Sequence, residues 1–169
     1  MLKGAAITFP LTIDGTTRIA IPEGLSAPQD AALSGLAAGL ERVRASTIAR
    51  DGSCLLFYVR FFRLVMNTNL LVAVDSGAIN AERDGDAIKV SYRLRTVRLC
   101  IMTTVMALAA VAATLFARVD LKMAIGVGVL AWLWLFGANY VITLFRFRGF
   151  VTRSVREGFA RSNRAPRAA

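Results

Sequence analysis

Two long stretches without a charged side chain dominate the hydrophobic pattern of the chain. They cover residues 99–117 and 123–145, and only the short segment 118–122 separates them. At about 1.5 Å per residue, helices of these lengths extend roughly 28 and 34 Å, against a bilayer hydrocarbon core about 30 Å thick. A short connection makes two helices antiparallel neighbours. The pattern therefore predicts a two-helix transmembrane hairpin over residues 98–145, with spans at about 99–117 and 123–145.

The region before the hairpin, residues 1–97, has the short alternating runs that are typical of β-strands. Asp14-Gly15 and Asp84-Gly85-Asp86 are hairpin-turn signals, and the alternation is clearest just before the first span. We expect an antiparallel sheet because turn signals separate most of the candidate strands. The candidate strands are residues 5–13, 17–21, 46–50, 54–64, 70–74, 78–83 and 87–95.

One helix is predicted within this N-terminal region. Ser26 is a suitable N-cap, Pro28 suits the first helical turn, and apolar residues recur at helical spacing from Ala32 to Val43. An amphipathic helix of this kind needs an apolar surface to cover. The predicted fold class is therefore α+β, an antiparallel sheet with one covering helix in a cytoplasmic domain, followed by the transmembrane hairpin.

The segment after the hairpin, residues 146–169, combines aromatic and arginine residues. Its apolar residues recur at helical spacing among five of its seven arginines, and its final residues have the composition of a disordered end. This pattern predicts a basic amphipathic tail that lies along the bilayer surface with its aromatic rings in the interface. The apolar positions concerned are Phe147, Phe150, Val151, Val155 and Phe159.

Charge supports the membrane assignment and gives an orientation. The chain has 169 residues, 56% of them hydrophobic, yet carries a net charge of +10. The basic residues flank the spans and are scarce in the connection, so the positive-inside rule places both termini on the cytoplasmic side of a bacterial inner membrane. Anionic headgroups are the expected lipid partner. The predicted membrane-surface contacts are Arg93, Arg95, Arg98, Arg146, Arg148, Phe150, Arg153 and Arg156. The sequence lacks the combination of basic and aromatic residues that is typical of nucleic-acid binding, so we expect no nucleic-acid partner.

The residues available for chemistry are few. The chain has no histidine and only two cysteines, which excludes imidazole catalysis and the common zinc and iron–sulfur sites. Asp75-Ser76-Gly77 after an apolar run resembles the catalytic loop of retropepsin-like aspartic proteases, but the flap and second glycine-ended strand of that family are missing. A plain β-turn is the favoured interpretation. Likewise Asp84-Gly85-Asp86 is better explained by a hairpin turn than by the Asp-x-Asp motif of glycosyltransferases. We expect no metal and no cofactor.

Small and polar residues within the spans predict helix contacts. Glycine and alanine allow close approach of helices, and the amide of Asn139 requires hydrogen-bond partners in lipid. Neither span contains an ionisable group of the kind that marks a transport path. The predicted helix-packing or partner-contact residues are Ala109, Ala113, Gly126, Gly137, Asn139 and Tyr140.

These features together favour a non-catalytic protein. The interpretation is an accessory, anchoring or scaffold subunit of an inner-membrane complex, which contacts other membrane subunits or itself. One alternative is a lipid- or ligand-binding regulatory module apposed to the bilayer, in which arginines of the sheet meet anionic headgroups. A remote alternative is a membrane-tethered aspartic protease that uses Asp75.

Overall fold

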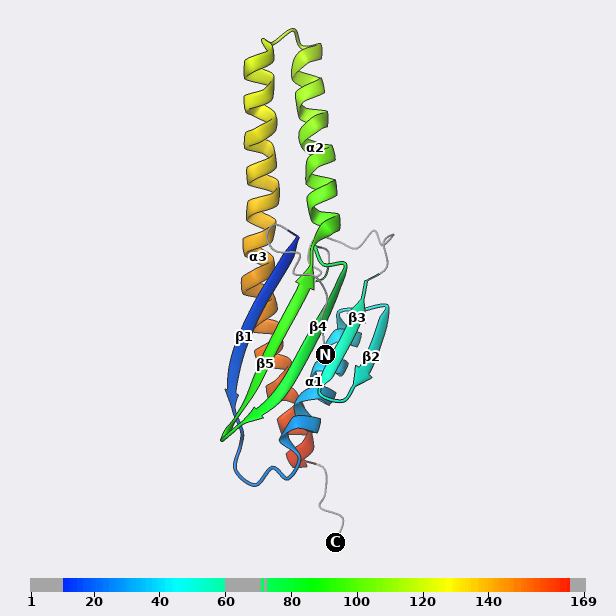
Figure 1. The fold of residues 1–169 in the computed structure, drawn as a ribbon, viewed down its shortest axis with the longest axis vertical. Coiled ribbons are helices and arrows are strands. Elements are labelled where there is room, and N and C mark those ends of the chain that lie inside the picture. Colours follow the sequence, from blue (N-terminus) through cyan, green and yellow to red (C-terminus); the bar gives the residue numbers. More distant parts are fainter. Residues whose placement is uncertain (1–10, 60–70, 72, 165–169) are drawn as a thin grey trace.

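The structure of the chain is a computed structural model, which describes residues 11–59, 71 and 73–164. A sheet domain lies at one end and two long helices project from it as a hairpin (Figure 1). The elements in chain order are β1 (Thr12–Ala20), α1 (Pro28–Arg42), β2 (Thr47–Asp51), β3 (Cys54–Tyr58), β4 (Ser76–Asp84), β5 (Ala87–Arg95), α2 (Val97–Phe116) and α3 (Leu121–Arg164).

Five strands form one antiparallel sheet in the order β1-β5-β4-β3-β2. The β2–β3 and β4–β5 connections are tight turns in which Gly52 and Gly85 adopt positive φ values, a conformation that glycine adopts without strain. Because β5 pairs with both β1 and β4, the strand that leads into α2 lies inside the sheet. The start of the hairpin is therefore anchored on both sides.

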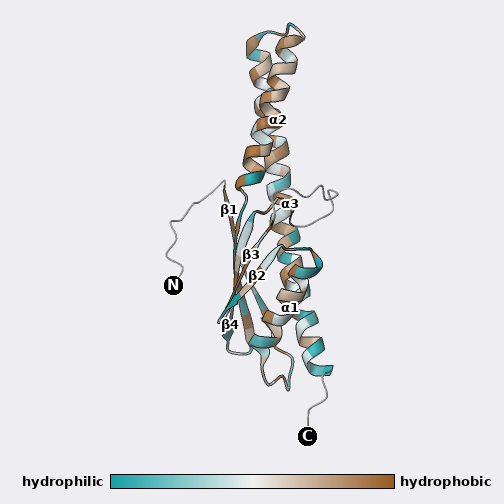
Figure 2. Ribbon diagram, turned by 90° about the vertical axis from the view of Figure 1, so that its right-hand side faces the viewer, coloured by the Kyte–Doolittle hydropathy of each residue, from teal (hydrophilic) through white to brown (hydrophobic). Residues whose placement is uncertain are grey.

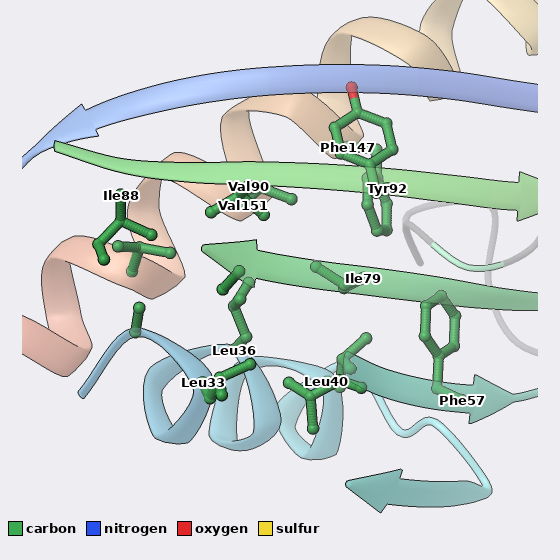
Figure 3. Packing of buried hydrophobic residues seen from close by; sticks show 14 of the residues in the cluster. Leu33, Leu36, Leu40, Phe57, Ile79, Ile88, Val90, Tyr92, Phe147 and Val151 are labelled. Carbon is green, nitrogen blue, oxygen red and sulfur yellow. The ribbon is translucent and has the colours of Figure 1, made fainter. Parts of the chain in front are cut away.

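The core lies between one face of the sheet and two helices. Figure 2 shows α1 and the second half of α3 on the same side of the sheet. Figure 3 shows leucines of α1, Phe147 and Val151 of α3, and alternate residues of the strands pointing toward one another. Alternation along β5 explains this, since Ile88, Val90, Tyr92 and Leu94 are buried while Lys89 and Arg93 between them are exposed.

The α+β sheet, its helix and the two long apolar helices confirm the coarse prediction from sequence. Both candidate spans lie within helices, α2 and the first half of α3. Only 11% of the most apolar window of each helix is buried, in contrast to a core helix of a soluble domain. Figure 2 shows the apolar colouring concentrated along this hairpin.

The predicted turn at Asp14-Gly15 is wrong, because β1 is one continuous strand through both residues. Gly15 pairs with Tyr92 of β5, and a Cβ at Gly15 would overlap the tyrosine ring. Asp14 pairs with Arg93 and accepts a hydrogen bond of 2.7 Å from its Nε. The glycine therefore makes room for a ring, and the aspartate forms a cross-strand ion pair.

Four further predictions change in detail. The helix N-cap is Ala27 rather than Ser26, and no side chain caps it. Asp75-Ser76-Gly77 is not a separate β-turn, because Ser76 and Gly77 already belong to β4. Of the predicted strand at 70–74, Leu71 and Ala73 lie in turns, while residues 70 and 72 lie outside the described residues. The predicted strand at 54–64 ends at Tyr58 as β3, and residues 60–64 also lie outside the described part.

The predicted basic tail along the bilayer surface is wrong for the described residues up to Arg164. The helix that begins at Leu121 continues without a break for 44 residues. Phe147, Val151 and Val155 are completely buried in the core of the sheet domain. An apolar stripe on a basic helix fits a lipid interface and a protein core equally well, and here it completes the core. The sheet is thus covered by two helices rather than one.

Candidate functional site at the junction of hairpin and sheet

Helix α3 belongs to both parts of the molecule. Its first half, residues 121–145, is apolar and largely exposed, and it packs against α2. Its second half, residues 146–164, covers the sheet beside α1. The helix type does not change between the halves. The junction between hairpin and sheet is therefore one continuous helix, and it is the candidate functional site.

Asp75 and Arg98 join the start of α2 to the sheet. The backbone N–H of Arg98 donates to Oδ2 of Asp75 at 2.9 Å, and the Arg98 Nε lies 3.3 Å from Oδ1. The guanidinium also donates to the carbonyl of Val74 at 3.1 Å. Backbone hydrogen bonds with Val59 and Arg95, each 2.8 Å, hold Asp75 itself in place. Two side chains and three backbone segments thus fix the point at which the hairpin begins.

Asp75 also acts as an electrostatic cap at the N-terminus of α2. The first turn of α2 contains no acidic residue, and Thr96 at its N-cap makes no side-chain capping bond. The first N–H groups of a helix lack partners within the helix and attract negative charge. Asp75 supplies that charge from a neighbouring segment. Its carboxylate is engaged by Arg98, whereas an aspartic-protease dyad needs a second carboxyl that shares its proton. The geometry therefore favours a structural role for Asp75.

Aromatic side chains of α3 connect the hairpin to the edge of the sheet. Trp132 stacks on Phe136 with ring centroids 4.8 Å apart, and Phe136 contacts Tyr140 at 5.7 Å. At one end, the indole N–H of Trp132 donates to Oγ1 of Thr104 on α2 at 3.1 Å. At the other, the Tyr140 hydroxyl donates to the backbone carbonyl of Thr12 at 3.1 Å. Residues at spacing i, i+4 lie on one face, so this row fixes α3 to both α2 and β1.

A second aromatic group continues inside the domain. The ring of Phe147 lies 4.9 Å from Tyr92 of β5, 6.4 Å from Phe57 of β3 and 5.5 Å from Phe150. Burial raises the pKa of the Tyr92 hydroxyl. Aromatic pairs in such geometries add about 0.5–1.5 kcal/mol beyond area burial. The half of α3 that covers the sheet is consequently held by the core itself.

The contacts within the hairpin differ from the predicted ones. The buried residues of the hairpin are Thr103 and Ala107 on α2, and Ala124, Gly128, Phe136 and Thr143 on α3. Gly128 is required by close approach, because a Cβ there would overlap Val111 of α2. The sequence alone does not indicate whether Gly126 or Gly128 contacts α2, because the answer depends on the rotation of α3 about its axis.

The predicted helix-contact residues lie mostly on the outside of the hairpin. Ala109, Ala113, Gly126 and Asn139 are exposed, and a side chain added at Gly126 or Gly137 would meet nothing within 4 Å. Asn139 donates from Nδ2 to the carbonyl of Leu135 at 2.7 Å, within its own helix. Tyr140 is the exception, through its bond to Thr12. Contact of the others with a partner stays a prediction.

The predicted membrane-surface residues are spread over several environments. Arg93 is paired with Asp14, Arg98 is largely buried with Asp75, and Phe150 is half-buried against α1 near Gly39. The remaining residues are exposed, and those on α3 include three that line a groove along its outer face. The groove is lined by Phe145, Arg148, Gly149, Thr152, Arg153, Arg156, Glu157 and Ala160. Arg95 and Arg146 are the other exposed members.

Glu157 ties the end of α3 to α1. Its Oε2 accepts a 2.8 Å bond from Nη2 of Arg42, and Oε1 accepts a 3.3 Å bond from Nη1. The hydrogen bond from Arg42, followed by nearby positive charges, lowers the pKa of the Glu157 carboxyl. Below these side chains, Gly35 and Gly158 let the two helix backbones touch, because a Cβ at either would overlap the other helix. Tight backbone packing and a bidentate ion pair thus lock α1 against α3.

The described residues contain no cluster of three or more cysteine or carboxylate side chains that could hold a metal ion. Cys54 and Cys100 are both free thiols, and burial, then the charge of Asp51, raises the pKa of Cys54. A raised thiol pKa disfavours the nucleophilic thiolate. The chemistry visible at the junction is ion pairing, hydrogen bonding and aromatic packing.

Comparison with known proteins returned no match to a family model, to a curated protein or to a solved structure.

Proposed function

We propose that the chain is a non-catalytic anchoring or scaffold subunit of a membrane assembly, which holds its sheet domain at a fixed height and orientation beside the bilayer. One observation carries this proposal. A single unbroken helix, α3, is both an exposed apolar span and the central covering helix of the domain. A domain that only needed tethering would be served by a flexible linker, whereas a continuous helix fixes its position.

The proposal places the hairpin of α2 and α3 in a bacterial inner membrane with both termini in the cytoplasm. It is supported by the exposed apolar surface of both helices and by the concentration of arginine and lysine at the sheet end rather than at the 118–122 turn. Exposed apolar surface on this scale needs lipid or another protein to cover it. The Asp75–Arg98 bonds and the aromatic row from Trp132 to Tyr140 then act as braces between hairpin and domain.

The direct experiment is purification of a tagged full-length copy from membranes in mild detergent, with mass spectrometry of the co-purifying proteins and measurement of the particle mass. The proposal predicts a defined assembly with stoichiometric membrane partners or multiple copies. A monomer without partners would contradict the scaffold role. Recovery of the protein from the soluble fraction would contradict the membrane placement.

A further inference from the structure

The outer face of α3 carries positive charge that the rest of the chain does not neutralise. All 11 acidic residues of the sequence lie within the described ranges. The ion pairs of the described residues use six arginines, and none of them is Arg148, Arg153 or Arg156. These three side chains line one groove. Other described arginines, such as Arg83, Arg95 and Arg118, also take no part in these ion pairs, but they lie on different elements, whereas these three line one groove.

The one acidic residue in the groove is already occupied. Glu157 is bonded to Arg42 of α1 at 2.8 Å and lies 3.6 Å from Arg161. Its charge is therefore shared between these two guanidinium groups, and Arg153 adds a weaker electrostatic attraction. The groove as a whole remains strongly basic, which makes a second copy of this chain, with a net charge of +10, an electrostatically poor occupant.

The distance of each arginine from the membrane end of the span indicates whether lipid headgroups or a protein partner contacts it. This step rests on the proposed placement of the span, whose last residue is Phe145. With a rise of about 1.5 Å per residue, Arg148 lies roughly 4–5 Å beyond that end, Arg153 about 12 Å and Arg156 about 16 Å. The headgroup layer on each side of a bilayer is only about 5–8 Å thick. The backbone of Arg148 therefore lies at headgroup level, whereas the backbone positions of Arg153 and Arg156 lie beyond it.

The lining of the groove suits an extended or helical segment. Gly149, Thr152 and Ala160 are small, and a side chain added at Gly149 would meet nothing within 4 Å. The groove follows α3 from residue 145 to 160, about 22 Å at 1.5 Å per residue. Exposed Phe145 offers an apolar contact at the hairpin end. Guanidinium groups bind carboxylates in bidentate geometry, which favours acidic side chains as their partners.

We propose that the groove on α3 formed by Arg148, Gly149, Thr152, Arg153 and Arg156 is a docking site for an acidic amphipathic segment of a partner protein. Carboxylates of the segment pair with Arg153 and Arg156, and an apolar residue at its end contacts Phe145. The sheet domain then acts as a rigid mount that presents this face at a fixed distance from the bilayer.

The test uses the full chain in phosphatidylcholine nanodiscs and a fluorescein-labelled 15-residue helical peptide of glutamate and leucine at i, i+3, i+4 spacing. Fluorescence anisotropy gives the Kd. The matched variants are Arg153→Gln/Arg156→Gln in the groove and Arg83→Gln/Lys89→Gln on the sheet, which remove the same charge. The docking site predicts a loss of affinity of about tenfold for the groove variant and less than twofold for the sheet variant.

Several outcomes would overturn this assignment: equal loss in both variants, equal affinity for a glutamine version of the peptide, or no binding at all. Displacement of the peptide when the nanodiscs contain 30% phosphatidylserine would also overturn it, in favour of anionic lipid on this face. Failure of the protein to enter nanodiscs would refute the membrane placement instead. The same titration in detergent micelles would then decide the peptide site separately.

Discussion

The carboxylate of Asp75 accepts a 2.9 Å hydrogen bond from the backbone N–H of Arg98 while it faces the guanidinium of the same residue at 3.3 Å. One acidic side chain from the segment before β4 therefore caps α2 and neutralises the arginine that follows β5. Both side chains are mostly shielded, with exposed fractions of 26% for Asp75 and 14% for Arg98. The ion pair at the junction is therefore shielded from solvent, as in the interior of a domain, and the junction is not an exposed linker.

Removing that carboxylate should loosen the junction. We expect Asp75→Asn to lower the free energy of unfolding by about 1–2 kcal/mol, because it leaves a shielded guanidinium without its counter-charge. Thermal unfolding of the full chain in detergent, followed by circular dichroism, measures this. Asp86→Asn, an exposed change in the β4–β5 turn, is the matched control. An Asp75→Asn variant as stable as the control would show that the pair contributes nothing.

Two glycines in one helix should respond in opposite directions to the same substitution. Gly128→Ala forces a Cβ against Val111 and should destabilise the hairpin by about 1–3 kcal/mol. Gly126→Ala meets open space and should be neutral or stabilising by up to about 1 kcal/mol, because alanine is the better helix former. Unfolding midpoints of the two variants in the same detergent check the prediction. Equal effects would mean that α2 and α3 pack in another register.

The contact between α1 and α3 should weaken in acid. The pKa of Glu157 is lowered in the folded state by the hydrogen bond from Arg42. A lowered folded pKa means that the stabilisation is complete above the unfolded pKa, about 4.3, and is lost as the pH falls through the folded value. The difference in unfolding temperature between the wild type and Glu157→Gln should therefore be present at pH 6 and shrink toward pH 3. A difference that stays constant over that range argues against the ion pair as its source.

Rotating one half of α3 against the other should disrupt the molecule. Insertion of a single alanine after Arg146 turns the following residues by about 100°. Phe147 and Val151 then no longer face the core while Tyr140 keeps its bond to Thr12. We expect a large loss of thermal stability and faster proteolysis of the sheet domain. A single alanine inserted in the connection between α2 and α3 is the control, and equal tolerance of both insertions would mean that the two halves are independent.

The sequence predicted the elements whose pattern has one physical meaning. Uncharged runs of spanning length became α2 and the first half of α3, and alternation along residues 87–95 became β5. The sequence-based prediction was wrong where one pattern is compatible with two different structures. Asp14-Gly15 is a turn signal, yet the glycine is needed beneath Tyr92, and that requirement arises only once β1 and β5 are paired. The apolar stripe from Phe147 to Phe159 suits a lipid interface as well as a core.

The candidate site was harder to foresee because it depends on contacts between distant segments. Asp75 and Arg98 lie 23 positions apart, and Tyr140 bonds to a residue 128 positions away. No local pattern reports such pairs. The groove arginines were recognised as basic residues at the membrane boundary, but their height above it became apparent only when α3 proved to be continuous.

The central claim is that α3 holds the sheet domain rigidly relative to the hairpin. It is tested most directly by double electron–electron resonance distances in phosphatidylcholine nanodiscs, with spin labels on cysteines introduced as Lys122→Cys in the first turn of α3 and Lys89→Cys on β5. The native cysteines are first removed by Cys54→Ser and Cys100→Ala, so that the spin labels react only with the two introduced cysteines. A rigid junction predicts a single narrow distance distribution that broadens after the alanine insertion behind Arg146. A broad or two-peaked distribution in the unmodified chain would contradict the account.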